Sequence, residues 1–314
     1  MKKIIPFYLA VIFFFGLSSC EKDIDVKIPE SENKLVVEGW IEQGLPPFVI
    51  LTKSASYFEK SDLTAFQNSF VHGAIITVSD GTTSVELTEF CSQNYSDAEL
   101  MIIAGAIGIS FETLKSVNYC LYSTFSGFQG AVGKNYSLKI VNDGKTYTSS
   151  TQIPNLVPLD SVWFKIDKGY EDKGLGYIYG HMTDPDTLGN AYRWSAKREG
   201  KDDSFGAPLG ASFNDKLING KSFEFGYDRP RGNNPDDPDE KEPYGGHYKM
   251  GDTIIIKFTT MDDAHFQFRT SYENYLASNG NPFASPTNIK TNILGGALGV
   301  WGGFGVSYDT IYGR

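Results

Sequence analysis

The sequence predicts a mainly β protein: a β-sandwich with a helical insertion, followed by a second β-rich domain with one aromatic helix. Two patterns support this prediction. Short segments alternate apolar and polar residues with a period of two, and Asp-Gly turns separate pairs of these segments at hairpin spacing. Aromatic residues make up 14% and charged residues only 21% of the 314 residues, so the chain can bury a core.

Residues 1–19 are predicted to be a lipoprotein signal peptide. Lys2 and Lys3 form a short positive region, and the apolar run 4–15 that follows is too short to span a bilayer as a mature helix. The next residues, LSSC, resemble the bacterial lipobox, in which the cysteine thiol receives a diacylglycerol. We therefore expect Cys20 to be lipidated and to begin the mature chain. The alternative is an ordinary signal peptide with a chance cysteine.

Residues 20–34 are predicted to be a lipidated tether. They are polar, contain Pro29, and begin with the acidic stretch EKDID, which resembles the export signal of surface lipoproteins in Bacteroidota. We expect an outer-membrane protein, anchored by lipid and exposed at the cell surface. The alternatives are that the charges only solvate the tether, and that the protein lies on the inner face of the outer membrane.

Residues 35–155 are predicted to form the sandwich domain. Two hairpins are expected around Asp80-Gly81 and Asp143-Gly144, because Asp-Gly between alternating segments is a strong turn signal. Short strands with glycine turns at this spacing favour a sandwich. The strand candidates are KLVVEGWIEQG, FVILTKSA, AIITVSDGTTSVELTEF and KNYSLKIVNDGKTYTSSTQI.

A helical insertion is predicted at about 96–118, where strand alternation stops. Ser96, with Glu99 three residues later, has the spacing of a capping box, and a second helix can begin after Ser110. Cys91 and Cys120 flank the insertion. An even pair of cysteines in an oxidising compartment favours a disulfide over two buried thiols. No metal site is expected, because neither cysteine has a His or Cys close to it in the sequence.

Residues 156–314 are predicted to form the second domain, after a proline-containing junction at 154–160. A helix capped by Asp262 or Asp263 is expected to end at Asn279-Gly280. Its apolar stripe is expected to face the core and consists of Phe268, Tyr272, Tyr275 and Leu276. The strand candidates are SVWFKID, LGYIYGHM, NAYRWSAKRE, SFEFGYD, DTIIIKFTTM and GVWGGFGVSYDTIYG.

The sequence does not predict an enzyme or a cofactor. Its four histidines, His72, His181, His247 and His265, form no H-E-x-x-H motif, and there is no G-x-S-x-G elbow. A Ser/His/Asp triad assembled from distant loops is left open as an alternative. The net charge of −10 argues against a nucleic-acid partner, which would require a basic surface.

Three further motifs are weighed against structural explanations. The acidic run NNPDDPDEKEP lacks EF-hand spacing, so a solvated loop is expected rather than a Ca²⁺ site; Asp184 and Asp186 are expected in a plain turn. The glycine-rich GGALGVWGGFG is expected to allow close strand packing rather than to bind phosphate. Four Asp-Ser/Thr-aliphatic tripeptides resemble an O-glycosylation motif of Bacteroidota. Ser161 and Thr187 are the better candidate acceptors, since Thr253 and Thr310 are in strand candidates.

The order of these features resembles the Bacteroidota lipoprotein family of domain of unknown function 4249. The most specific part runs from Asn281-Pro282-Phe283 to the glycine-rich end. The N-terminal part is similar to immunoglobulin-like or transthyretin-like sandwiches. The resemblance implies a TonB-dependent receptor as partner and supplies no catalytic residues. We expect an accessory or binding subunit of a TonB-dependent transporter, with a structural or assembly lipoprotein of the envelope as the alternative.

Overall fold

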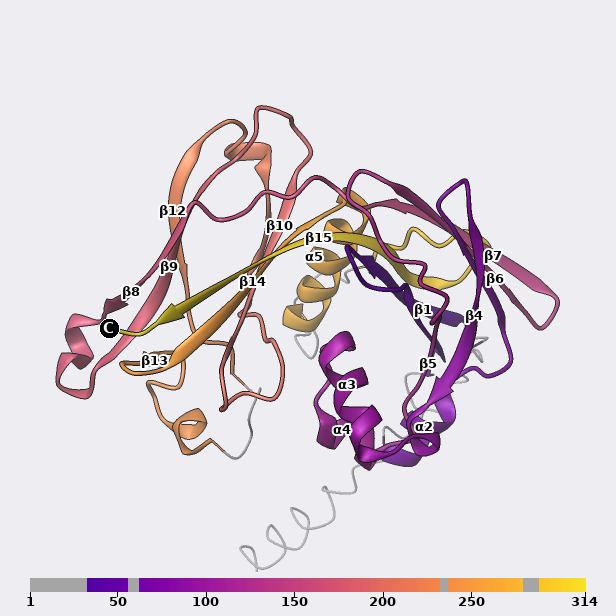
Figure 1. Ribbon diagram of the computed structural model, residues 1–314, viewed down its shortest axis with the longest axis horizontal. Helices are drawn as coiled ribbons and strands as arrows, with labels where there is room; N and C mark the ends of the chain where they lie inside the picture. The colour runs from indigo at the N-terminus through magenta and orange to yellow at the C-terminus, as the bar shows by residue number, and fades with distance from the viewer. Residues whose placement is uncertain (1–32, 56–61, 232–236, 279–287) are drawn as a thin grey trace, which may run out of the picture. The chain divides into compact units, whose positions relative to one another are not determined.

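A computed structural model describes residues 33–55, 62–231, 237–278 and 288–314, and residues 33–314 form one compact unit (Figure 1). The protein is mainly β, as predicted. The signal peptide, Cys20, most of the tether and Asn281–Phe283 lie outside the described residues. No helix within the described ranges combines the length and the apolar character that crossing a membrane requires.

The first half of the chain contains the predicted strands and the predicted insertion. Both predicted hairpins are present, with Ser79 paired to Ser84 and Asn142 paired to Lys145. In chain order the elements are β1 (Leu35–Glu42), β2 (Phe48–Lys53), α2 (Leu63–Ser69), β3 (Ile75–Ser79), β4 (Ser84–Cys91), η1 (Ser92–Asn94), α3 (Asp97–Ile107), α4 (Phe111–Ser116), β5 (Cys120–Ser123), β6 (Asn135–Asn142) and β7 (Lys145–Gln152). The short helix α2 was not predicted.

The insertion packs on one face of the strands that flank it. Strand β2 is buried on both faces: Val49 and Leu51 belong to the sandwich core, while Phe48 and Ile50 lie in a second cluster with Ile103 of α3. Burying such side chains stabilises the fold by about 1.5–3 kcal/mol each. The backbone N–H of Ser96 donates to the Glu99 carboxylate (2.8 Å), so the cap predicted for α3 is present.

The predicted disulfide joins Cys91 and Cys120, which are direct partners on β4 and β5. It closes the chain at the base of the insertion, with a sequence separation of 29 residues. In the chain-entropy description, a crosslink of this span stabilises the fold by about 3–4 kcal/mol.

The second half of the chain adds two sheet regions and one long helix. Its elements are β8 (Ser161–Ile166), η2 (Lys168–Lys173), β9 (Leu175–Thr183), β10 (Ala191–Arg198), β11 (Ser212–Asn214), η3 (Asp215–Leu217), β12 (Ser222–Tyr227), η4 (Pro238–Lys241), β13 (Tyr248–Lys249), β14 (Thr253–Met261), α5 (Asp263–Ser278) and β15 (Leu298–Tyr312). A smaller sheet pairs β9 with β8, β12 and β13.

The long strand β15 links the two halves (Figure 1). It pairs in parallel with β1 through its first half and antiparallel with β14 through its second half, within a sheet of order β11-β10-β14-β15-β1-β2-β5-β4-β3-β6-β7. Trp301 belongs to the hydrophobic cluster of the first half, and Ile311 packs against that of the second. The division into domains at residues 155/156 stays a prediction.

The glycines of β15 allow close packing, as the sequence analysis expected. A Cβ at Gly299, whose φ is +103°, would lie 1.9 Å from the carbonyl oxygen of Val37. A Cβ at Gly303 would lie 2.3 Å from the carbonyl oxygen of Gln152. Backbone from β1 and β7 therefore approaches β15 more closely than any side chain would permit.

The prediction that the apolar stripe of α5 faces the core is wrong. Tyr272, Tyr275 and Leu276 are exposed, whereas the buried positions of the helix are His265 and Ser271. The helix instead packs a polar face inward, where His265 lies against Gly302 of β15. Asp262 caps the helix, accepting from the His265 backbone N–H at 2.8 Å.

Candidate functional site

The structure places the predicted glycosylation candidates on the surface. Ser161 is exposed at the start of β8, and Thr187 is exposed in the loop between β9 and β10. Asp184, at the beginning of that loop, is buried and accepts hydrogen bonds from the Tyr192 hydroxyl and from the Gly220 backbone N–H. Its carboxylate therefore organises the loop.

The four histidines lie apart and have different partners. His181 pairs with Asp160 (3.1 Å), His247 pairs with Asp167 (2.9 Å), and His72 pairs with Glu89. The fourth, His265, is buried in α5.

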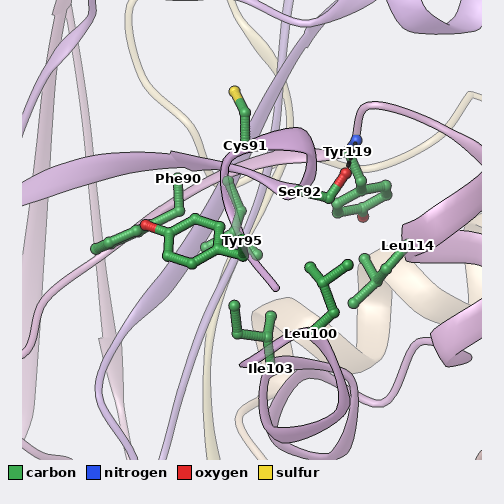
Figure 2. Close-up of a pocket in the computed structure, with 9 residues that line it drawn as sticks. Phe90, Cys91, Ser92, Tyr95, Leu100, Ile103, Leu114 and Tyr119 are labelled. Atoms are coloured by element: carbon green, nitrogen blue, oxygen red, sulfur yellow. Dashed lines mark hydrogen bonds between the residues drawn. The ribbon is translucent and has the colours of Figure 1, made fainter. Parts of the chain in front are cut away.

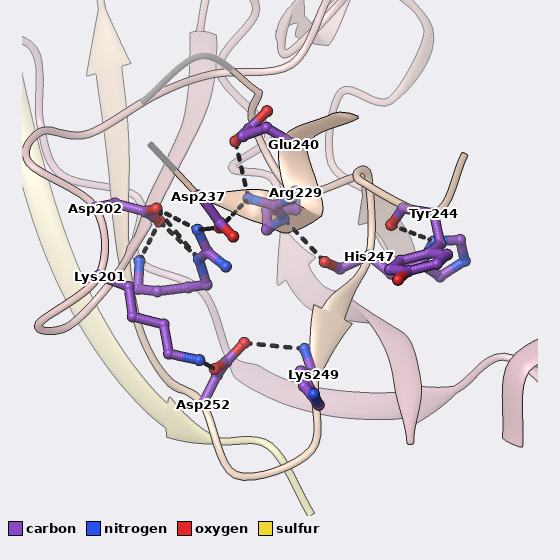
Figure 3. A network of polar contacts seen from close by, with 10 residues as sticks. Lys201, Asp202, Arg229, Asp237, Glu240, Tyr244, His247, Lys249 and Asp252 are labelled. Carbon is purple, nitrogen blue, oxygen red and sulfur yellow. Dashed lines mark hydrogen bonds and ion pairs between the residues drawn. The ribbon is translucent and has the colours of Figure 1, made fainter. Parts of the chain in front are cut away.

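Two carboxylates in the described part of the acidic loop, Asp237 and Glu240, are not solvated as the sequence predicted. Asp237 bonds Arg198 Nη2 at 2.5 Å and lies 3.5 Å from Arg229, while Glu240 accepts from Arg229 at 3.0 Å (Figure 3). Asp202 completes the cluster with bonds to the Arg198 backbone and guanidinium. The loop therefore closes over two buried arginines, which no local sequence pattern reveals.

Charge pairing makes this cluster structural. Burial alone would lower the pKa of Arg198, but the carboxylates of Asp202 and Asp237 outweigh burial and hold that pKa above its usual value. Arg229 is equally buried and also donates to the His247 carbonyl at 2.9 Å. The carboxylates of Asp237 and Glu240 are committed to arginines, so they are poorly suited to holding a metal ion.

A small apolar cavity lies beneath the helical insertion (Figure 2). Leu100, Ile103 and Leu114 line it from the helices, and Phe90 and Leu121 from the strands. Its volume of about 10 Å³ is at the lower limit for one water, which needs roughly 10–15 Å³. This cavity is a packing gap rather than a binding site.

The aromatic groove is the best candidate site for a ligand. It is an open hollow of about 420 Å³. It is lined by Phe213 and Asn214 of β11, Leu217 and Ile218 after it, Phe223, Phe225 and Tyr227 of β12, and Phe266 of α5. Binding sites for small or extended ligands have this size and this mainly apolar lining.

The wall of the aromatic groove is held by ring-to-ring contacts. Phe213 and Phe225 meet edge to face with centroids 5.6 Å apart, and Phe225 meets the buried Trp194 at 5.8 Å. Strand β12 alternates its aromatic residues, Phe223, Phe225 and Tyr227, with exposed residues, so one face of the strand lines the groove. Pairs of this geometry restrict the rings, and the groove is therefore largely preformed.

The rim of the aromatic groove is anchored by a buried carboxylate. Asp215 accepts the backbone N–H groups of Gly189 (2.6 Å) and Asn190 (2.7 Å), which fixes the turn that carries Leu217. Leu217 itself is 85% exposed. A fixed turn that presents an exposed leucine beside an aromatic wall favours apolar contact with another molecule.

Charged groups lie behind one end of the groove. Arg193 donates to the Ser212 hydroxyl (2.7 Å) and to Glu273 of α5 (3.1 Å). Burial raises the pKa of Tyr227 to about 12, with Arg193 lowering and Glu273 raising it, so this hydroxyl stays protonated and donates to the Gly210 carbonyl. These bonds hold Tyr227, and the chain just before Phe213, in place.

The sequence analysis identified SFEFGYD as a strand but did not foresee the groove. The alternation of Phe223, Phe225 and Tyr227 marks one apolar face. Phe213 and Phe266 reach that face from other parts of the chain, so their assembly requires the tertiary structure.

A family model described as Domain of unknown function (DUF4249) matches residues 21–310. A search of curated proteins found no match.

Proposed function

The chain belongs to the family described as Domain of unknown function (DUF4249), and we propose that it is a non-enzymatic binding subunit. In this proposal Cys20 anchors it to the outer membrane at the cell surface, where it serves a TonB-dependent transporter. The lipobox and the acidic stretch after it support the location. The aromatic groove supports the binding role.

The aromatic groove favours an extended apolar segment as its occupant. Strands β11 and β12 are each the outermost strand of their sheet order. An outermost strand offers backbone hydrogen-bonding groups to an added strand, and alternating pockets beside it take up the side chains. An apolar segment of the receptor matches both features.

The tether supports a partner in the same membrane. Residues 21–34, fully extended, reach at most about 3.5 Å each, or roughly 50 Å in all. An anchor of this length keeps the protein near the membrane surface and raises its effective concentration beside other membrane proteins.

Co-purification from native membranes tests the proposal. The tagged wild-type protein, in mild detergent, should recover a TonB-dependent receptor. Leu217→Glu should reduce that recovery at least tenfold, because a charge enters the apolar groove. The matched control is Leu209→Glu, at a leucine that is 87% exposed and outside the groove lining, and it should leave recovery unchanged.

The outcomes separate the parts of the proposal. Recovery of the receptor by all three proteins would support the partner and reject the groove as the contact. The accessory role would be rejected if the lipoprotein is recovered alone and deletion of the lipoprotein gene leaves nutrient uptake through the receptor unchanged. That result would favour a structural or assembly role.

A further inference from the structure

A second cluster of reactive side chains surrounds the disulfide. One ligand atom each from His72, Glu89, Cys91 and Cys120 lies within 4.8 Å of all the others. Glu89 and Cys91 share a face of β4 because they are two residues apart, and Cys120 is opposite Cys91 on β5. His72 comes from the segment before β3, so the sequence does not indicate that it meets the cysteines.

These side chains are held in place by their surroundings. The hydroxyl of Tyr122 donates to the Val71 carbonyl (2.8 Å) and accepts from the Ala74 backbone N–H (3.3 Å). These bonds fix the chain on both sides of His72. The Gly73 backbone N–H donates to Glu89 Oε2 (3.0 Å), which leaves Oε1 facing His72 and 3.7 Å from the sulfur of Cys91.

We propose that the dithiol form of this protein binds a thiophilic divalent cation such as Zn²⁺ through Cys91, Cys120, His72 and Glu89. Two thiolates, one imidazole and one carboxylate match the ligand types and the number that tetrahedral zinc takes. Zinc bond lengths place tetrahedral ligand atoms about 3.3–3.8 Å apart. Once the sulfurs are no longer bonded to each other, small side-chain rotations bring the four groups to that spacing.

The chemistry balances in both directions. The newly made chain carries two thiols, and binding of one cation replaces their two protons. Thiol–disulfide exchange with a disulfide oxidant passes two electrons and two protons to that oxidant, which leaves as a dithiol, and forms the Cys91–Cys120 disulfide, which withdraws both thiolate ligands. A small dithiol reductant reverses that step and is itself oxidised to a disulfide. The cation therefore ties β4 to β5 at the base of the insertion when the covalent bond is absent.

The cluster is open to an incoming ion. The His72 side chain is 56% exposed and that of Glu89 is 24% exposed. Cys91 also lines the apolar cavity under the helices, but in Figure 2 its sulfur points away from Leu100, Ile103 and Leu114. Both cysteines are at least partly buried, so an ion would approach from the side of His72 and Glu89.

Cobalt substitution tests the site with the full folded protein. The protein, reduced and freed of metal, should bind one Co²⁺ with the visible bands of tetrahedral cobalt and a thiolate charge-transfer band, and Zn²⁺ should displace it. The oxidised protein should bind none. His72→Ala and Glu89→Gln should each weaken Zn²⁺ binding by at least about tenfold. Even residues that only hydrogen-bond to a metal ligand cost roughly 10–100-fold in metal affinity when they are mutated.

The matched control is His181→Ala, which removes another histidine paired with a carboxylate, Asp160. It should bind Co²⁺ as the wild type does. The proposal is overturned if the reduced wild-type protein binds no Co²⁺. It is also overturned if the reduced His72→Ala variant has the same Co²⁺ bands and the same affinity as the wild type. Circular dichroism of each reduced variant shows whether a lost band reflects a lost ligand or a lost fold; an unfolded His72→Ala leaves Glu89→Gln to decide.

Discussion

The buried arginines Arg198 and Arg229 are both paired with carboxylates. Asp202 holds Arg198 through three bonds to its side chain and one to its backbone, with both side chains almost fully buried. The pair is a weak argument for net stability, but removing one partner leaves an uncompensated buried charge. The same reasoning applies to Asp237 and Glu240, which close the acidic loop over the arginines.

Removing the Asp202 carboxylate should therefore be costly. We expect Asp202→Ala to lower the free energy of unfolding by about 3–5 kcal/mol. Asp97→Ala, which breaks the exposed pair with Lys115, should cost less than about 1 kcal/mol. Urea denaturation of both variants measures the difference, and equal costs would contradict the structural role of the cluster.

His265 should make stability depend on pH. Its side chain is buried, Arg269 donates to its Nε2 at 3.1 Å, and Nδ1 has no partner among the described residues. Burial, together with Arg269 and Arg193, lowers the pKa of His265 well below its usual 6.5. Below pH 6.5 the unfolded chain therefore takes up a proton that the folded state excludes.

The folded state should lose stability as the pH falls from 6.5 towards the folded pKa of His265, by at most about 1.4 kcal/mol per pH unit. Burial raises the pKa of Asp262. As the pH falls below that raised pKa, the folded state takes up this proton before the unfolded chain does, so Asp262 adds stability where His265 removes it. Urea midpoints over a descending pH series should fall in the wild type and fall less in His265→Gln. Equal slopes in the two proteins would show that His265 is not the group responsible.

At the scale of elements, strand β15 depends on its glycines. Gly299→Ala should lower the free energy of unfolding by about 3 kcal/mol more than Gly296→Ala does. This difference lies at the upper end of the usual cost of overpacking. Both glycines have positive φ (+103° and +91°), but only Gly299 has backbone within reach of a Cβ, whereas nothing lies within 4 Å at Gly296. Thermal denaturation gives the comparison, and equal losses would mean that backbone strain rather than close packing decides.

The strands were predictable because local signals determine them. Asp-Gly turns and period-two alternation placed both hairpins and most other strands. The orientation of α5 was not predictable from its apolar stripe. Its inward face is set by His265 against Gly302, where a Cβ would lie 2.1 Å from Nδ1, and by Arg269, so a polar network outweighs the aromatic residues.

At the scale of the whole molecule, the candidate sites arise from contacts between distant segments. The aromatic groove combines β11, β12 and α5, and the cysteine cluster combines β4, β5 and the segment that carries His72. Sequence spacing could suggest that Glu89 and Cys91 share a strand face. It could not bring His72 to the disulfide or Phe266 to the groove, because those contacts depend on how the sheets and helices pack.

The central claim is that the aromatic groove receives an apolar segment of a TonB-dependent receptor. Cross-linking in intact cells tests this claim most directly. A photoreactive phenylalanine analogue replaces Leu217 in the groove, or Leu209 as the exposed control outside it. The account predicts a cross-link from position 217 to a TonB-dependent receptor, and none from position 209. No receptor cross-link from position 217, or equal cross-linking from both positions, would contradict it.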